Sequence, residues 1–139
     1  MLVTVAKQER RRALKELDGD RNGFQEEFRR RLLEEDGFSG RVLDIGCGNS
    51  LPSALKPLKG KWGQLDGVDP SSAVESHPNL SNRWCSEFET SEAPEGVYYL
   101  AFAYNVVEHV AHPEAFMRKA YSALKEGGVF WALTSNAGH

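Results

Sequence analysis

The sequence predicts an α/β protein with a Rossmann-like, doubly wound and mostly parallel sheet. Apolar runs alternate with short helical patterns from Gly40 onward, and such alternation builds a parallel sheet with helices on both faces. The first run leads into the glycine turn Gly46-Cys47-Gly48, and the second, residues 64–68, is followed by Asp69. A glycine turn and an acid after neighbouring strands are typical of a nucleoside-binding half-site.

The residues before this region form helices by pattern. One helical stripe is formed by apolar side chains that recur every fourth position: Phe24, Phe28 and Leu32. Asn22 and Gln25 resemble a capping box at the start of this helix, and Gly37 suits its exit turn. An earlier helix is expected to contain residues 13–17. We therefore expect N-terminal helices before the sheet.

The remaining elements follow in alternation. Strands are expected at residues 42–45, 64–68, 83–86, 97–104 and 129–134. A short helix limited by two prolines is expected at 50–58, and a longer one at 113–125, with Pro113 in its first turn and Gly127-Gly128 at its end. The polar connection between the second and third strands is expected to carry His77 as a surface residue.

The end of the sequence is abrupt. It stops soon after the fifth expected strand, which would leave a mostly apolar edge strand bare. We therefore expect a fold truncated after that strand, with the C-terminal strands missing. The expected organisation is an N-terminal helical segment at 1–39 and a Rossmann-like domain at 40–139.

Composition limits the classes of function. The net charge of −3 argues against binding nucleic acid through bulk electrostatics. The arginine clusters at 10–12 and 29–31 are interspersed with glutamates, which favours a solvated helix face. Two cysteines give neither a disulfide framework nor a metal spacing. With no membrane span and no signal sequence, we expect a cytoplasmic protein.

Four blocks of this chain, in order and with matching spacing, resemble class I S-adenosylmethionine-dependent methyltransferases. They are VLDIGCGNS, LDGVDPSS, AFAYNVVEHVAHPEAFMRKAYSALKEGGVF and WALTSN. Within that family, the chain looks most like the small methyltransferases that include the ubiquinone-biosynthesis O-methyltransferases. The resemblance covers residues 40–136 and implies S-adenosyl-L-methionine as the cofactor.

The chemistry of the glycine loop agrees with this resemblance. A dinucleotide site usually has a third glycine and presents a helix N-terminus to a pyrophosphate. Here the loop runs from Gly46 to Leu51 without a third glycine, and Asp44 would place negative charge beside a pyrophosphate. S-adenosylmethionine has no phosphate; it carries an ammonium and a sulfonium, which an acid attracts.

The resemblance implies a set of cofactor-binding positions: Asp44, Gly46, Cys47, Gly48, Asp69, Pro70, Ser86, Glu87, Tyr104 and Asn105. Asp44 would reach the methionine ammonium, and Asp69 would accept hydrogen bonds from the ribose hydroxyls. Ser86 and Glu87 are both candidates for the adenine amine. From the residues alone, Asp44 could instead cap the following turn, and Cys47 fits a small packing residue better than a nucleophile.

Two histidines follow the fourth strand. His109 is the candidate catalytic residue, as a base for an acceptor that must lose a proton. Together with Glu108, His109 and His112 could suggest a metal pair, but the spacing does not define one, and we expect no metal. Capping at the helix entrance accounts for His112.

The sequence favours methyl transfer to a small-molecule acceptor. In-line displacement at a carbon activated by positive sulfur mainly requires alignment of the reactants. The alternatives are a module that binds S-adenosylmethionine without turnover, an NAD-dependent oxidoreductase and an aminopropyl transferase. The sequence contains no combined aromatic and basic patch of the kind that binds nucleic acid, so no nucleic-acid partner is expected. Neither the acceptor atom nor the oligomeric state follows from the sequence.

Overall fold

The computed structural model describes residues 23–134. Its centre is a five-stranded sheet in the order β3-β2-β1-β4-β5, and every neighbouring pair is parallel. The strands are β1 (Arg41–Ile45), β2 (Gln64–Asp69), β3 (Asn82–Cys85), β4 (Tyr98–Tyr104) and β5 (Leu124–Leu133). This architecture confirms the Rossmann-like fold class, with all described strand pairs parallel.

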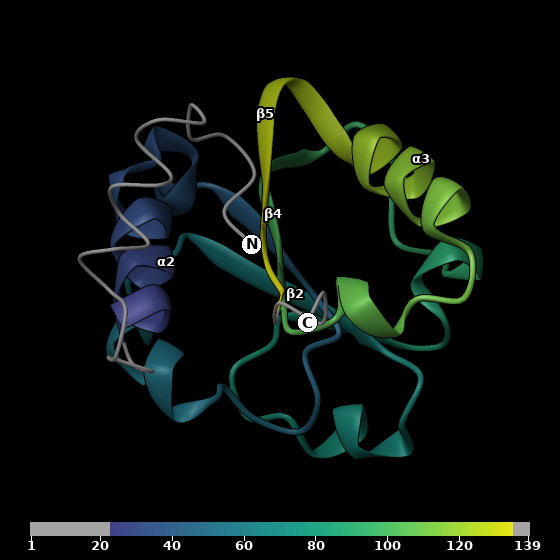
Figure 1. The fold of residues 1–139 in the computed structure, drawn as a ribbon, viewed down its shortest axis with the longest axis horizontal. Helices are drawn as coiled ribbons and strands as arrows, with labels where there is room; N and C mark the ends of the chain where they lie inside the picture. Colours follow the sequence, from purple (N-terminus) through teal and green to yellow (C-terminus); the bar gives the residue numbers. More distant parts are fainter. Residues whose placement is uncertain (1–22, 135–139) are drawn as a thin grey trace.

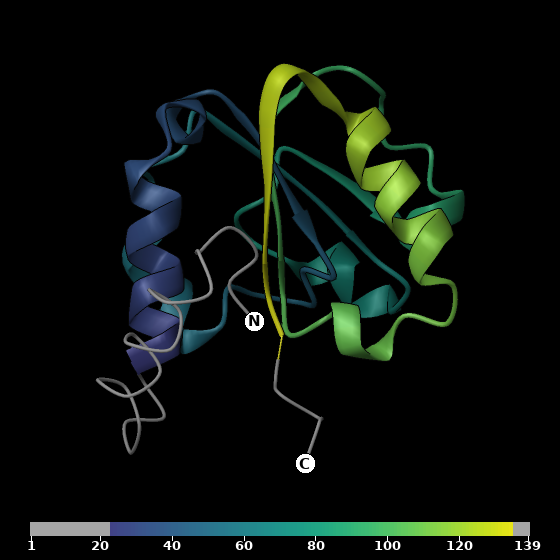
Figure 2. The same ribbon diagram turned by 45° about the horizontal axis from the view of Figure 1, so that its top comes forward.

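Two α-helices cover opposite faces of the sheet. The helix α2 (Gly23–Glu34) packs on one face and α3 (Pro113–Ala123) on the other, as both ribbon views show (Figures 1 and 2). Short 3-10 helices occupy the connections: η1 (Asp36–Ser39), η2 (Ser53–Leu58), η3 (Ser72–Ser76), η4 (Phe88–Thr90) and η5 (Val107–His109). Within residues 23–134, no helix combines the length and apolar composition that a bilayer span requires.

Each face of the sheet has its own hydrophobic core. On the α2 side, Phe28 and Leu32 pack with sheet residues such as Phe102 and Trp131. On the α3 side, Phe116 packs with residues from β1 and β4 and with Ala120 and Ala123 of its own helix. The two cores follow from the alternation of side chains along buried strands.

The expected helix over Phe24, Phe28 and Leu32 is confirmed as α2, and Phe28 and Leu32 are fully buried. Its expected exit at Gly37 is wrong, because α2 ends at Glu34 and Gly37 lies within η1. Gly37 instead allows a close approach, since a Cβ there would lie 2.8 Å from the Cβ of Tyr99. Asn22, the earlier helix and Arg10–Arg12 lie outside the described residues.

Glutamates of α2 form ion pairs with two of its arginines. Arg30 forms ion pairs with Glu27 and Glu34, and Arg31 pairs with Glu27. Arg29 donates a hydrogen bond to the backbone oxygen of Ala54 at 2.9 Å. Two of the three described arginines, Arg30 and Arg31, are therefore paired with acids of the same helix, whereas Arg29 binds backbone of the neighbouring segment.

The predicted end of the long helix is wrong. The helix α3 ends at Ala123, and Leu124 already pairs with Tyr98 as the first residue of β5. The strand then contains Gly127, with φ 79°, and a register shift before pairing resumes at Leu100. The glycines therefore lie within an irregular strand instead of terminating a helix.

Two connections also differ from expectation. The helix expected at 50–58 is the 3-10 helix η2, which starts at Ser53 and includes Pro57. His77, expected on the surface, is 1% exposed. Its Nδ1 accepts a hydrogen bond from the backbone nitrogen of Asn79 at 3.2 Å. Arg83 donates to the carbonyl oxygens of the same connection: Val74, Glu75, His77 and Leu80.

Candidate active site at the carboxyl ends of the strands

The sheet reverses its strand order beside β1, which pairs with β2 on one side and β4 on the other. Ligands of open α/β sheets bind outside the carboxyl ends of the strands at such a point. A pocket of about 620 Å³ lies there. Its lining comes from the ends of β1, β2 and β4, from the segments after β3 and before α3, and from α3 itself: Ile45, Gly46, Val68, Asp69, Pro70, Glu87, Phe88, Glu89, Tyr104, Asn105, Val106, His109, Val110, Ala111, His112 and Phe116.

The glycine turn is held by the end of β2. The backbone nitrogens of Gly46 and Cys47 donate to the backbone oxygen of Val68 at 2.8 and 3.2 Å. The carboxylate of Asp69 accepts from the backbone nitrogen of Gly48 at 2.9 Å and from that of Ser71 at 2.8 Å. Asp69 therefore ties the glycine turn to the segment after β2 and lines the pocket at the same time.

Gly46 is required by both conformation and space. Its φ of 76° lies in the left-handed region, and a Cβ would lie 2.3 Å from Cγ2 of Val106. Gly48 also has a positive φ, of 61°, but a Cβ there would meet nothing within 4 Å. A side chain is therefore excluded more strictly at Gly46 than at Gly48, because the turn at Gly46 packs against Val106 in the segment after β4.

Asp44 is a buried carboxyl group without a donor. It is 3% exposed, and no described residue donates a hydrogen bond to its side chain. Burial, together with the charge of Asp69, raises its pKa to about 8. Asp44 pairs with Phe102, and Tyr104 lies two residues further along β4, so Asp44 and Tyr104 lie on the same sheet face.

The end of β4 presents Tyr104 and Asn105. Tyr104 packs against Phe28 of α2 with ring centroids 6.0 Å apart, and burial raises the pKa of its hydroxyl. Asn105 has a φ of 55°, and its backbone nitrogen donates to the backbone oxygen of Leu133 at 2.7 Å. A positive φ at a non-glycine residue marks a local conformation that its surroundings enforce.

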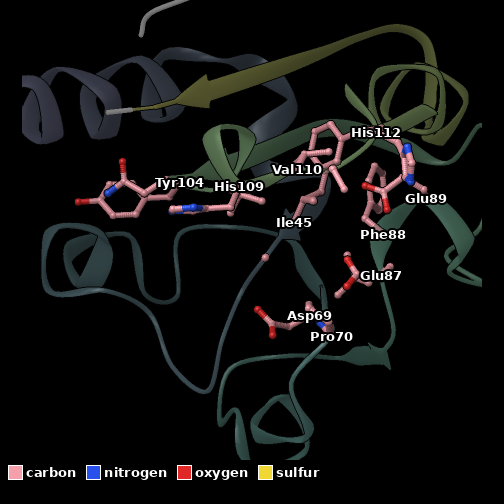
Figure 3. Close-up of a pocket in the computed structure, with 16 residues that line it drawn as sticks. Ile45, Asp69, Pro70, Glu87, Phe88, Glu89, Tyr104, His109, Val110 and His112 are labelled. Atoms are coloured by element: carbon pink, nitrogen blue, oxygen red, sulfur yellow. The ribbon is translucent and has the colours of Figure 1, made fainter. Parts of the chain in front are cut away.

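The structure brings most of the predicted site residues to this pocket. Those that line it are Gly46, Asp69, Pro70, Glu87, Tyr104, Asn105 and His109. Figure 3 shows Asp69 and Pro70 at the end of β2, with Tyr104 and His109 toward one end of the view and Phe88 and His112 toward the other.

Four predicted residues lie outside the pocket lining: Asp44, Cys47, Gly48 and Ser86. Cys47 is buried in the core on the α2 side, with 4% of its surface exposed. Burial raises the pKa of its thiol, which keeps the thiol neutral and agrees with a packing role. The Oγ atom of Ser86 is buried and has no hydrogen-bond partner within residues 23–134.

The two histidines that line the pocket stand in different surroundings. The side chain of His109 is 79% exposed, and its Nε2 lies 4.0 Å from Oε1 of Glu108. His112 stands at the N-cap position of α3, but its side chain caps no backbone group. The expected capping role of His112 is therefore wrong. In the described part of the chain, no three acidic, histidine or cysteine side chains gather as a metal site.

Sequence reasoning missed the aromatic wall of the pocket. Phe88 and Phe116 are buried edge to face with centroids 5.2 Å apart, and both line the pocket. Phe116 has a helical spacing that signals a core position, and Phe88 follows a weak strand. Neither pattern distinguishes a pocket wall from ordinary core, so only the fold reveals this surface.

The charge of the pocket is acidic. Asp69, Glu87 and Glu89 line it, and its described lining contains no lysine or arginine. A phosphate-bearing ligand would meet these carboxylates without a cationic partner. A ligand with positive charge is favoured on the same grounds.

Comparison with known proteins gives the same class as the fold and the site. Residues 10–139 match a family model described as a methyltransferase domain, and the chain belongs to that family. It is 33% identical over 119 residues to a ubiquinone biosynthesis O-methyltransferase of Bradyrhizobium sp. (strain ORS 278), covering 78% of this chain and 46% of that protein. A mitochondrial protein of the same name from Mus musculus is 32% identical over 108 residues, covering 69% of this chain and 29% of that protein.

Solved structures share the fold. The geranyl diphosphate C-methyltransferase from Streptomyces coelicolor A3(2), crystallised with S-adenosyl-L-homocysteine, aligns with a TM-score of 0.60 and 19% identity over 79% of this chain and 42% of that one. The [4+2]-cyclase SpnF aligns with a TM-score of 0.65 and 20% identity over 82% and 47% of the two chains. The chain spans less than half the length of the curated relatives named above.

Proposed function

We propose that this chain binds S-adenosyl-L-methionine in the pocket beside β1 and transfers its methyl group to a small-molecule acceptor. The observation that carries the proposal is the pair of carboxyl groups around the glycine turn, Asp44 and Asp69, in a chain of the methyltransferase domain family. The acceptor group that we propose is a hydroxyl, since the similar curated proteins are named O-methyltransferases.

The residues present fit the cofactor. Each oxygen of Asp69 accepts one backbone hydrogen bond and keeps further acceptor capacity for the vicinal ribose hydroxyls. The absence of a Cβ at Gly46 keeps the backbone close to the pocket, and Asp44 supplies an acid that no described side chain neutralises. Glu87 lines the pocket and would accept from the adenine amine, and the aromatic wall would cover the base.

The bound cofactor supplies a methyl group that positive sulfur has already activated. The task of the protein is then to hold the acceptor in line with that methyl group, which can lower a barrier by several kcal/mol. We propose that Tyr104 and Asn105 line the acceptor side of the methyl group. His109 is exposed at the same end of β4 and can accept the proton of an acceptor hydroxyl.

An NAD-dependent oxidoreductase is less well supported. The loop lacks a third glycine, and the pocket carries carboxylates where a pyrophosphate would need donors. We also propose a cytoplasmic location, in keeping with two cysteines that remain free thiols in the structure.

Ligand-dependent melting tests the proposal. A ligand that binds only the folded chain raises its melting temperature with concentration. We expect S-adenosylhomocysteine to raise it and NAD to leave it unchanged. Asp69→Ala should weaken S-adenosylhomocysteine binding by about tenfold or more, since two hydroxyls lose a charged acceptor. Glu92→Ala, an exposed acid outside the pocket, is the control. Stabilisation by NAD alone would contradict the proposal.

The acceptor and the base require a separate measurement. Methyl transfer to a panel of small hydroxyl, thiol and amine compounds would identify the acceptor group. With an active acceptor in hand, His109→Asn should lower kcat more than it changes cofactor affinity. Equal loss of both would remove His109 as the base.

A further inference from the structure

Asp44 differs from Asp69 in that no hydrogen-bond donor or cation among the described residues compensates the burial of its carboxyl group. Asp69 accepts two backbone hydrogen bonds, whereas Asp44 is almost fully buried and accepts none from a described residue. An ionised carboxylate in such surroundings is unfavourable unless a donor or a cation reaches it. In the empty site, the favourable form of Asp44 is therefore the neutral acid.

The charged groups near Asp44 reinforce this preference. On β2, Asp69 carries a negative charge that disfavours a second one. Cys47, in the turn after β1, is held as a neutral thiol chiefly by burial and also by the charge of Asp69, and Arg83 of β3 acts on it in the opposite direction. On β4, Tyr104 of the same sheet face is kept neutral by burial. Asp69 is thus the described charge that acts on Asp44, and no described cation offsets it there.

The position of Asp44 links it to the pocket. Asp44 does not itself line the pocket, but it shares a sheet face with Tyr104, which does, and Gly46, two residues further along the chain, also lines it. The ammonium of an amino-acid ligand at the glycine turn would be the missing cation. Its charge would reverse the local balance and favour ionised Asp44.

We propose that Asp44 is protonated in the empty site and that binding of the cofactor's ammonium expels this proton to solvent. This inference rests on the proposed function. The balance is that of a neutral carboxylic acid and an ammonium forming a carboxylate–ammonium pair and one free proton, with no other bond made or broken. The affinity for a ligand that carries the methionine ammonium therefore depends on pH through Asp44, whereas the affinity for the adenosine portion alone does not.

Calorimetry of the 139-residue chain in two buffers of different ionisation enthalpy tests the proposal, because the difference in heat counts the protons released. For S-adenosylhomocysteine at pH 7.0, we expect a release close to one proton per ligand, since burial raises the pKa of Asp44 to about 8. The same pKa predicts affinity about tenfold tighter at pH 7.0 than at pH 6.0. The comparison ligand is 5′-methylthioadenosine, which keeps the adenosyl thioether but lacks the ammonium, and it should release none.

Variants separate Asp44 from other titrating groups. Asp44→Asn should bind S-adenosylhomocysteine without proton release and with little change in affinity between pH 6.0 and 7.0. Glu92→Gln removes an exposed acid outside the pocket and should behave as the wild type. The wild-type measurement decides the matter even where Asp44→Asn fails to fold.

Three results would overturn the inference. One is binding of S-adenosylhomocysteine with no proton released, and another is equal release with 5′-methylthioadenosine. Both would leave the proposed function standing, because the ligand would still bind. Binding of neither ligand would overturn the proposed function, and the inference with it.

Discussion

At the scale of single residues, Gly46 has the strictest requirement in the site. Its positive φ and the 2.3 Å approach of a Cβ to Val106 act together. We expect Gly46→Ala to lower the free energy of unfolding by about 2–4 kcal/mol, of which about 1 kcal/mol is conformational and the rest is overpacking. Urea denaturation measures the change.

Gly48 is the matched control for this prediction. It has a positive φ but open space around the Cβ position, so Gly48→Ala should cost only the conformational part, about 1 kcal/mol. The double variant Gly46→Ala with Val106→Ala should recover part of the loss due to crowding. Equal destabilisation by the two single alanine substitutions would contradict the assignment of a steric role to Val106.

His77 is expected to make the stability of the fold depend on pH. Burial, and then the charge of Arg83 on β3, lowers its pKa from the ordinary value of 6.5. The unfolded chain therefore binds more protons than the folded one below about pH 6.5, and stability falls as the pH drops through that window. The hydrogen bond that Nδ1 accepts from Asn79 would also be lost on protonation there.

The comparison variant is His77→Asn, whose Oδ1 can accept the same hydrogen bond without titrating. Between pH 7.0 and 5.5, the wild type should lose more free energy of unfolding than this variant. His112→Asn replaces an exposed histidine and should follow the wild type. The idea fails if His77→Asn and the wild type lose stability in parallel.

At the scale of elements, a buried hydrogen-bond network joins the amino-terminal ends of four adjacent strands, β3, β2, β1 and β4. Asp66 of β2 is fully buried and accepts hydrogen bonds from Arg41 at 3.0 Å, from Tyr98 at 2.8 Å and from the side chain of Asn82 at 3.0 Å. Gln64 donates to it as well, at 3.1 Å. The network lies at the amino-terminal ends of the strands, opposite the pocket, and it fixes the strand register there.

Asp66→Asn should therefore destabilise the fold by about 3 kcal/mol or more, because Arg41 loses its partner and several donors lose an acceptor. Tyr98→Phe removes one donor to a charged acceptor and should cost about 1.5–3 kcal/mol. Chemical denaturation distinguishes the two. Neither substitution should change ligand affinity directly, and a ligand-binding loss larger than the loss of stability would contradict the separation of the two edges.

At the scale of the whole molecule, the site lowers the stability of the fold that supports it. The pKa of Asp44 is raised from 3.8 to about 8, so the folded chain holds a proton that the unfolded chain releases between those values. Stability of the empty protein thus falls as the pH rises through this window, by about 1.4 kcal/mol per pH unit at most.

Asp44→Asn should remove that slope. Between pH 6.5 and 7.5, the wild type should lose about 1 kcal/mol more than the variant in the absence of ligand. Urea denaturation at the two pH values measures the difference. A variant with the same slope as the wild type would show that Asp44 is not the group responsible.

The sequence by itself determined the class of fold and the place of the glycine turn. Alternation of apolar runs and the turn at Gly46 are local features, and local spacing is sufficient to predict strands that meet at one edge. The same reasoning located Asp69 at the tip of its strand, where the structure ties it to Gly48.

Only the tertiary structure decided how those residues are used. The aromatic wall of Phe88 and Phe116, the burial of His77 and the start of β5 at Leu124 depend on contacts between segments distant in sequence. Burial and neighbouring charge likewise set the protonation of Asp44, because they act through space. A sequence names the acid, and the packing around that acid decides whether it carries a charge.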